Sequence, residues 1–129
     1  LNKRENMSLG ELIYTPEKAT GEAITKAESH TPKIEAPTEI RKDQPFTIKI
    51  SVGPHPNKLE HSIRKIEAYL SEEERKFNPI HLTTITLTPH YTEPNITITL
   101  KLRRNSTLHV LAYCNLHGIW EARKKLKIK

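Results

Sequence analysis

Residues 96–103 read ITITLKLR, and in this stretch apolar side chains alternate strictly with polar or charged ones. Alternation with a period of two is typical of an antiparallel strand that has one face in a core and the other in water. The same pattern recurs at residues 46–51 and 65–70, and strands of this kind also fit residues 108–114 and 120–128. The stretch therefore indicates a domain built from half-buried antiparallel strands.

Residues 80–88 predict a further strand that contains a defect. Its apolar positions change parity between Leu82 and Ile85. One extra residue in a strand has this effect. We therefore expect a β-bulge near residues 83–84.

The composition disfavours helices. The chain has nine prolines and many threonines, which suit turns and strands better than helix interiors. The one helical signal is a possible capping box at residues 71–74, which Pro79 cuts short. We predict an all-β, immunoglobulin-like sandwich or barrel of seven antiparallel strands over residues 21–129. Residues 1–20 are weakly patterned, and we interpret them as an N-terminal extension.

The charge and hydropathy of the chain bear on its partners and its location. The net charge is +6, but the basic residues are spread along the chain and aromatic residues make up only 5%. This distribution favours a solvated surface over a nucleic-acid interface. No segment has the length of a membrane span or the pattern of a signal peptide, so we expect no membrane partner and a cytoplasmic location.

One cysteine and four histidines predict a metal site. The single Cys114 excludes an internal disulfide, and it continues the inward parity of its strand to the rim of the core. His117 follows three residues later, His55 and His61 bracket a loop that contains prolines, and His30 stands two residues before a proline. We expect each of the four histidines in a turn at a strand end. Stiff loops at strand ends commonly carry binding groups.

The other three histidines have simpler interpretations. His81 and His109 alternate against apolar neighbours and should point outward, and His90 lies in a turn-like segment. We expect all three to lie outside the metal site.

The ligand types narrow the choice of metal. Structural zinc sites are usually richer in cysteine, and magnesium and calcium prefer oxygen ligands. A cupredoxin-like electron-transfer protein is an open alternative, but blue copper sites generally use an axial methionine, and the only methionine is Met7 in the N-terminal extension. Iron fits better, with imidazoles around a plane, a thiolate on one axis and the opposite position open.

Four stretches resemble the superoxide reductases of the neelaredoxin type. They are KAESHTPKIEAP (26–37), VGPHPNKLEHSIRKIEAY (52–69), YTEPNITITLKL (91–102) and AYCNLHGIWE (112–121). Together they cover the chain from about residue 22 to residue 121 in the family's order. Larger relatives carry an additional four-cysteine iron domain, which a chain with one cysteine cannot form. The chain therefore looks like a one-iron member.

The resemblance implies a mononuclear non-haem iron that reduces superoxide to hydrogen peroxide in a one-electron step. The implied ligands are four equatorial histidines and one axial cysteine, namely His30, His55, His61, His117 and Cys114. Glu28 matches the family's glutamate that becomes the sixth ligand in the ferric state. The resemblance also implies a rubredoxin-like electron donor and a homotetramer.

One position departs from the family pattern. The family usually has a lysine between the glutamate and the first histidine, whereas this chain has Ser29. That lysine is credited with attracting superoxide and helping to protonate the product. Either this role is dispensable here or another cation supplies it, and the candidates are Lys58, in the loop between His55 and His61, and Lys26, two residues before Glu28.

Overall fold

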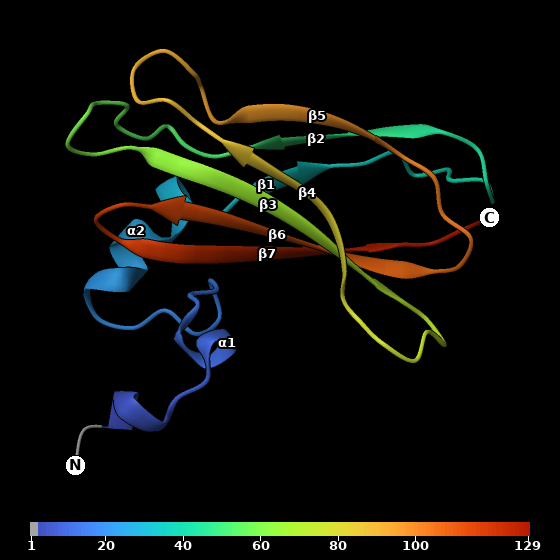
Figure 1. Cartoon of the computed structure of the whole chain (residues 1–129), viewed down its shortest axis with the longest axis horizontal. Helices are drawn as coiled ribbons and strands as arrows, with labels where there is room; N and C mark the ends of the chain where they lie inside the picture. Colours follow the sequence, from blue (N-terminus) through green and yellow to red (C-terminus); the bar gives the residue numbers. More distant parts are fainter. Residues whose placement is uncertain (1–2) are drawn as a thin grey trace.

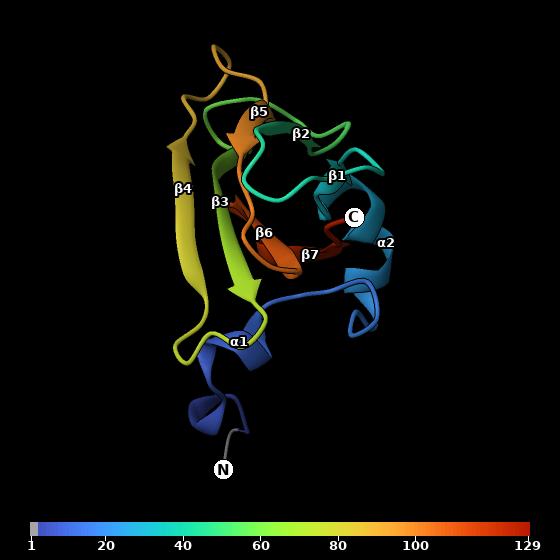
Figure 2. The same cartoon turned by 90° about the vertical axis from the view of Figure 1, so that its right-hand side faces the viewer.

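The computed structural model describes residues 3–129, which form two antiparallel sheets packed face to face (Figures 1 and 2). The strands are β1 (Lys33–Glu35), β2 (Phe46–Ser51), β3 (Ile63–Glu72), β4 (Ile80–Thr86), β5 (Asn95–Leu100), β6 (Ser106–Cys114) and β7 (Gly118–Leu126). One sheet has the order β1-β2-β5 and the other has the order β4-β3-β6-β7. The prediction of a seven-stranded antiparallel sandwich is confirmed.

The alternation seen in the sequence places the core between the two sheets. In the larger sheet Leu70 pairs with Leu108 and Ala68 with Val110, and all four side chains are buried. The smaller sheet contributes apolar pairs such as Ile48 with Ile98. Burial of apolar surface on both inner faces is the main force that holds such a sandwich together.

The bulge in β4 lies one residue earlier than predicted. Ala68 of β3 pairs with Thr83, whereas the next residue, Tyr69, pairs with His81. Leu82 is therefore the extra residue. The insertion lets the apolar side chains on both sides of it face the core.

The possible capping box at residues 71–74 does not start a helix. Strand β3 continues to Glu72, whose N–H donates to Oδ1 of Asn78 at 3.0 Å, while Nδ2 of Asn78 donates to the Glu72 carbonyl at 3.0 Å. The Asn78 side chain thus occupies the backbone groups that a helix needs. The capping-box residues instead form the end of β3 and the turn toward β4.

The structure contains helices at the N-terminal side that the sequence pattern did not reveal. They are a 3-10 helix at Lys3–Asn6, α1 (Leu9–Leu12) and α2 (Glu22–His30). Helix α2 lies beside β1 and β7 (Figure 2), and it ends where the N–H of Thr31 donates to the Ala27 carbonyl, just before Pro32. His30 therefore lies on the last turn of a helix and not, as predicted, in a turn at a strand end. None of the helices between residues 3 and 129 is long and apolar enough to cross a membrane.

Candidate metal centre

Three segments meet at one end of the sandwich, and each carries candidate ligands (Figure 1). Helix α2 ends there with His30, the loop from β2 to β3 brings His55 and His61, and the turn from β6 to β7 brings Cys114 and His117. The structure thus gathers all five predicted ligands from segments far apart in the sequence.

The four imidazole rings form a closed circuit in which each ring lies edge-on to the next. The ring centroids of His30 and His55 are 4.6 Å apart, and those of His55 and His61 are 4.7 Å apart. The circuit closes through His117, at 5.1 Å from His61 and 5.0 Å from His30. Four edge-on rings around a common centre are the arrangement that a planar set of four imidazole ligands requires.

The thiol of Cys114 lies against this circuit. Its side chain is fully buried at the end of β6, and its Sγ is 3.7 Å from Nδ1 of His117. Ligand atoms of His30, His61, Cys114 and His117 all lie within 4.8 Å of one another. His55 is not in that set, but its Nε2 is 3.1 Å from Nε2 of His30.

Backbone carbonyls fix which ring nitrogen of two histidines faces the centre. Nδ1 of His30 is 2.9 Å from the Lys26 carbonyl, and Nδ1 of His55 is 2.7 Å from the Pro56 carbonyl. A carbonyl only accepts, so both Nδ1 atoms carry the proton and, in the neutral rings, both Nε2 atoms present a lone pair. Such an outward N–H bond is the usual support of a metal-bound histidine.

The inward nitrogens fit a bound cation. Two lone pairs 3.1 Å apart repel each other unless a proton or a metal ion lies between them. Nε2 of His61 is also buried and has no hydrogen-bond partner, which costs free energy in the absence of a ligand. Imidazole nitrogens and one thiolate form a donor set suited to a transition metal such as iron.

Burial keeps the imidazoles of His30, His55 and His117 in the neutral form that binds metal. Burial lowers the pKa of His30 to about 4, with smaller contributions from the neighbouring histidines. Burial is also the main cause of the lowered pKa of His55 and of His117, and the Lys26 ammonium lowers the pKa of His117 further. Neutral rings with free lone pairs are therefore ready at neutral pH.

Two asparagines that the sequence analysis missed hold the ligand loops in place. Oδ1 of Asn115 accepts from the N–H of Ser62 at 3.0 Å, and its Nδ2 donates to the Glu60 carbonyl at 2.9 Å. Asn115 therefore joins the turn that holds Cys114 to the residues on both sides of His61.

Asn57 makes a similar link between the loop that carries His55 and the turn at residues 90–92. Its Nδ2 donates to the Thr92 carbonyl at 3.1 Å, and its Oδ1 accepts from the N–H of His90 at 2.7 Å. Asn115 directly follows Cys114 and Asn57 stands two residues after His55, and this closeness to the ligands in the quoted motifs was the signal that could have identified them.

Ser29, at the position that departs from the family pattern, supports His30. Its hydroxyl donates to the Lys26 carbonyl at 3.2 Å, and its oxygen lies 2.8 Å from Nδ1 of His30, so it accepts from that N–H. Glu28 is exposed on the same helical turn and is not among the clustered ligand atoms. Lys26 is half-buried and lines a pocket with His117, whereas Lys58 is exposed and pairs through its backbone with His61.

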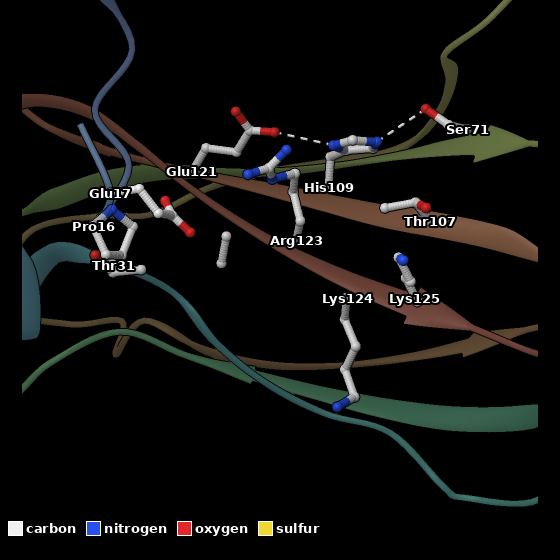
Figure 3. A pocket seen from close by; sticks show the side chains of 11 residues that line it. Pro16, Glu17, Thr31, Ser71, Thr107, His109, Glu121, Arg123, Lys124 and Lys125 are labelled. Carbon is white, nitrogen blue, oxygen red and sulfur yellow. Dashed lines mark hydrogen bonds and ion pairs between the residues drawn. The ribbon is translucent and has the colours of Figure 1, made fainter.

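The remaining histidines lie outside the cluster, in line with the sequence prediction. His109 lines a pocket of about 670 Å³, and Figure 3 shows its ring between Glu121 and Ser71. Its Nδ1 is 3.0 Å from Glu121 and its Nε2 is 2.9 Å from the Ser71 hydroxyl. His81 is exposed on β4, and His90 lies in a turn with a φ of 74°.

Comparisons with known proteins agree with this geometry. The desulfoferrodoxin family model matches residues 22–123. The structure of superoxide reductase (neelaredoxin) from Ignicoccus hospitalis is 58% identical in sequence to this chain and superposes on it with a TM-score of 0.89. The match covers 95% of this chain and 100% of the Ignicoccus chain. Superoxide reductase from Pyrococcus abyssi is 37% identical over 108 residues, which are 79% of this chain and 90% of the relative.

Neelaredoxin from Megalodesulfovibrio gigas is 32% identical over 119 residues, which are 81% of this chain and 91% of the relative. The family model covers most of the chain and includes all five residues of the cluster. The chain therefore belongs to the desulfoferrodoxin family, as a superoxide reductase of the neelaredoxin type.

Proposed function

We propose that this chain reduces superoxide to hydrogen peroxide at one iron held by four imidazoles and one thiolate. The ligands are His30, His55, His61, His117 and Cys114. The observation that carries the proposal is the closed circuit of imidazoles with two unprotonated Nε2 atoms 3.1 Å apart and a buried thiol beside it.

An iron held by these residues would supply one-electron redox chemistry, and the Cys114 thiolate would donate electron density to it. Each superoxide takes up one electron and two protons to become hydrogen peroxide. The chain's own part is to hold the four imidazoles edge-on to one another, to keep the thiol away from water, and to present the positive charge of Lys26 in the pocket beside His117. The net charge of +6 also attracts an anionic substrate.

We further propose that Lys26 supplies the cation that Ser29 does not. Lys26 lines the same pocket as His117, and its charge lowers the pKa of that ring. Lys58 is the alternative, since it stands between two ligands in the sequence, but its side chain is exposed, so salt screens its charge more strongly. We also propose Glu28 as the sixth ligand of the oxidised iron. It lies two residues before His30.

The family resemblance also suggests the partners of the reaction. We propose a rubredoxin-like protein as the electron donor and a homotetramer as the assembly. Strand β4 supports assembly, because within residues 3–129 it pairs with β3 alone and leaves one edge open. Sedimentation analysis tests the tetramer, and the rate of re-reduction by a purified rubredoxin tests the donor.

Metal analysis combined with an optical spectrum of the oxidised protein tests the proposed centre. We expect stoichiometric iron and a thiolate-to-iron charge-transfer band. His61→Ala should lose iron, whereas the matched control His81→Ala, an exposed histidine outside the cluster, should keep it. Stoichiometric copper, which the cupredoxin-like alternative requires, or loss of iron in both variants would contradict the proposal.

A further inference from the structure

The segment before residue 22, which the family model does not match, reaches the edge of the metal centre. The N–H of Tyr14 donates to the Ile119 carbonyl at 2.9 Å, and the N–H of Glu121 donates to the Tyr14 carbonyl at 2.8 Å. These two bonds form a parallel bridge that places Tyr14 beside Trp120 on β7. Ile13 and Thr15, on either side of Tyr14, are buried. The position of Tyr14 is therefore set by backbone pairing and by its buried neighbours.

Tyr14 is the outer member of a stack of three rings that ends on a ligand. Its ring lies 4.8 Å from that of Trp120 at an interplanar angle of 23°, and Trp120 lies 5.5 Å from His30 at 36°. Trp120 is 1% exposed, so Tyr14 forms part of its cover from solvent. Aromatic pairs in such stacked arrangements stabilise each other beyond the burial of their surface.

Trp120 also reaches a second ligand through its polar atom. Its Nε1 donates to the carbonyl of His117 at 3.0 Å. One indole ring therefore packs against the imidazole of His30 and anchors the backbone of His117. Any tilt of this ring changes the surroundings of two ligands at once.

We propose that Tyr14 is a positioning residue of the metal centre: by stacking on Trp120 it fixes the orientation of His30 and the backbone of His117. The role rests on the metal site of the proposed function. It depends on the ring of Tyr14, because the contact with Trp120 is made face to face. Residues that orient metal ligands commonly affect metal retention strongly when they are changed.

The first test uses the metal-free protein with Tyr14→Leu and Tyr14→Phe. Trp120 is the only tryptophan, so its fluorescence reports the stack without interference. Tyr14→Leu should shift this emission to longer wavelength and move the imidazole proton NMR signals of His30 and His117. Tyr14→Phe, which keeps a stacking ring, should leave both readouts as in the wild type. Unchanged signals in Tyr14→Leu, or equal changes in Tyr14→Phe, overturn the proposal.

The second test measures how fast the iron-loaded protein loses its metal to an excess of chelator. Tyr14→Leu should lose iron roughly five- to tenfold faster, and Tyr14→Phe should stay within about twofold of the wild type. Leu9→Ala is the matched control, since Leu9 is an exposed apolar residue of the same N-terminal segment. Equal loss in Leu9→Ala assigns the effect to general loosening of the segment and overturns the proposal.

The two tests separate this inference from the proposed function. A wild-type chain that holds no iron contradicts the proposed function, while the metal-free signals of Tyr14→Leu still decide whether Tyr14 positions the two histidines. Conversely, suppose that the wild type binds iron while Tyr14→Leu keeps the wild-type fluorescence, NMR signals and rate of iron loss. That result overturns only the role of Tyr14.

Discussion

Which ring nitrogen of each histidine carries the proton, and which presents its lone pair to the centre, decides what this site can bind. The Lys26 and Pro56 carbonyls accept hydrogen bonds from the Nδ1–H groups of His30 and His55, and this turns both Nε2 lone pairs inward. The Ser29 hydroxyl oxygen is a second acceptor at Nδ1 of His30. The sequence predicted the five ligands from residue type and spacing, but it could not predict these contacts, because they depend on where the backbone of α2 and of the loop before β3 runs.

Cys114→Ser tests the axial role of the thiol. An alcohol is a far weaker donor to iron than a thiolate, so the charge-transfer band should disappear. The fold should persist, because the replacement is nearly the same size at a buried position. Absorption and far-UV circular dichroism measure the two effects, and a band that survives in Cys114→Ser contradicts the assigned ligand.

Lys26→Ala and Lys58→Ala form a matched pair that locates the missing cation. We expect Lys26→Ala to slow the second-order reaction with superoxide roughly threefold at low salt, and we expect the difference to shrink as salt screens the charge. Lys58→Ala should have a smaller effect, because its side chain is exposed. Pulse radiolysis gives the rates. A larger effect in Lys58→Ala assigns the role to Lys58, and unchanged rates in both exclude both residues.

At the scale of elements, the site depends on loops that are linked by side chains. The apolar pattern identified the strands that support these loops, and the prolines marked the loops themselves. Helix α2 escaped the prediction because its only apolar residues are small or exposed, such as Ala27 and Ile24, so the sequence shows little helical periodicity. Its last turn carries His30 because Pro32 prevents the helix from continuing.

Asn115→Ala tests the link between the turn of Cys114 and the residues around His61. The change leaves the N–H of the fully buried Ser62 without its partner, which costs about 1–3 kcal/mol of unfolding free energy. It should also weaken iron binding roughly tenfold or more, because the loop that carries His61 loses its support. Denaturant unfolding and competition with a chelator measure the two effects.

Asn57→Ala is the comparison for that experiment. Asn57 joins the loop of His55 to the turn around His90, which carries no ligand. We expect a smaller loss of iron affinity than in Asn115→Ala, since only one ligand segment is involved. Greater loss in Asn57→Ala contradicts the view that the link between two ligand segments matters most.

At the scale of the whole molecule, the sandwich serves as a frame that brings distant segments to one end. The alternation in residues 96–103 and in its counterparts predicted two sheets around one core, and the structure has them. The short strand β1 was not located from sequence, because three residues show too little alternation. The pairing of Tyr14 with β7 was not foreseen either, since an isolated bridge leaves no periodic pattern.

A metal held by the five residues would stabilise the folded chain, because they come from α2, the loop before β3 and the turn after β6. A ligand that binds only the folded state raises the free energy of unfolding with its excess over Kd. We expect removal of iron to lower the midpoint of thermal unfolding by about 5 °C or more. Calorimetry of the loaded and metal-free protein measures this, and equal midpoints contradict binding at the cluster.

The most direct test of the central claim is the product balance when the reduced, iron-loaded protein reacts with superoxide. Hydrogen peroxide and dioxygen are measured together, with Cys114→Ser as the control. Reduction at this centre predicts one hydrogen peroxide for each superoxide consumed, no dioxygen formed from superoxide, and one oxidised iron left behind. One dioxygen for every two superoxides consumed, or a Cys114→Ser variant that reacts as fast as the wild type, would contradict the account.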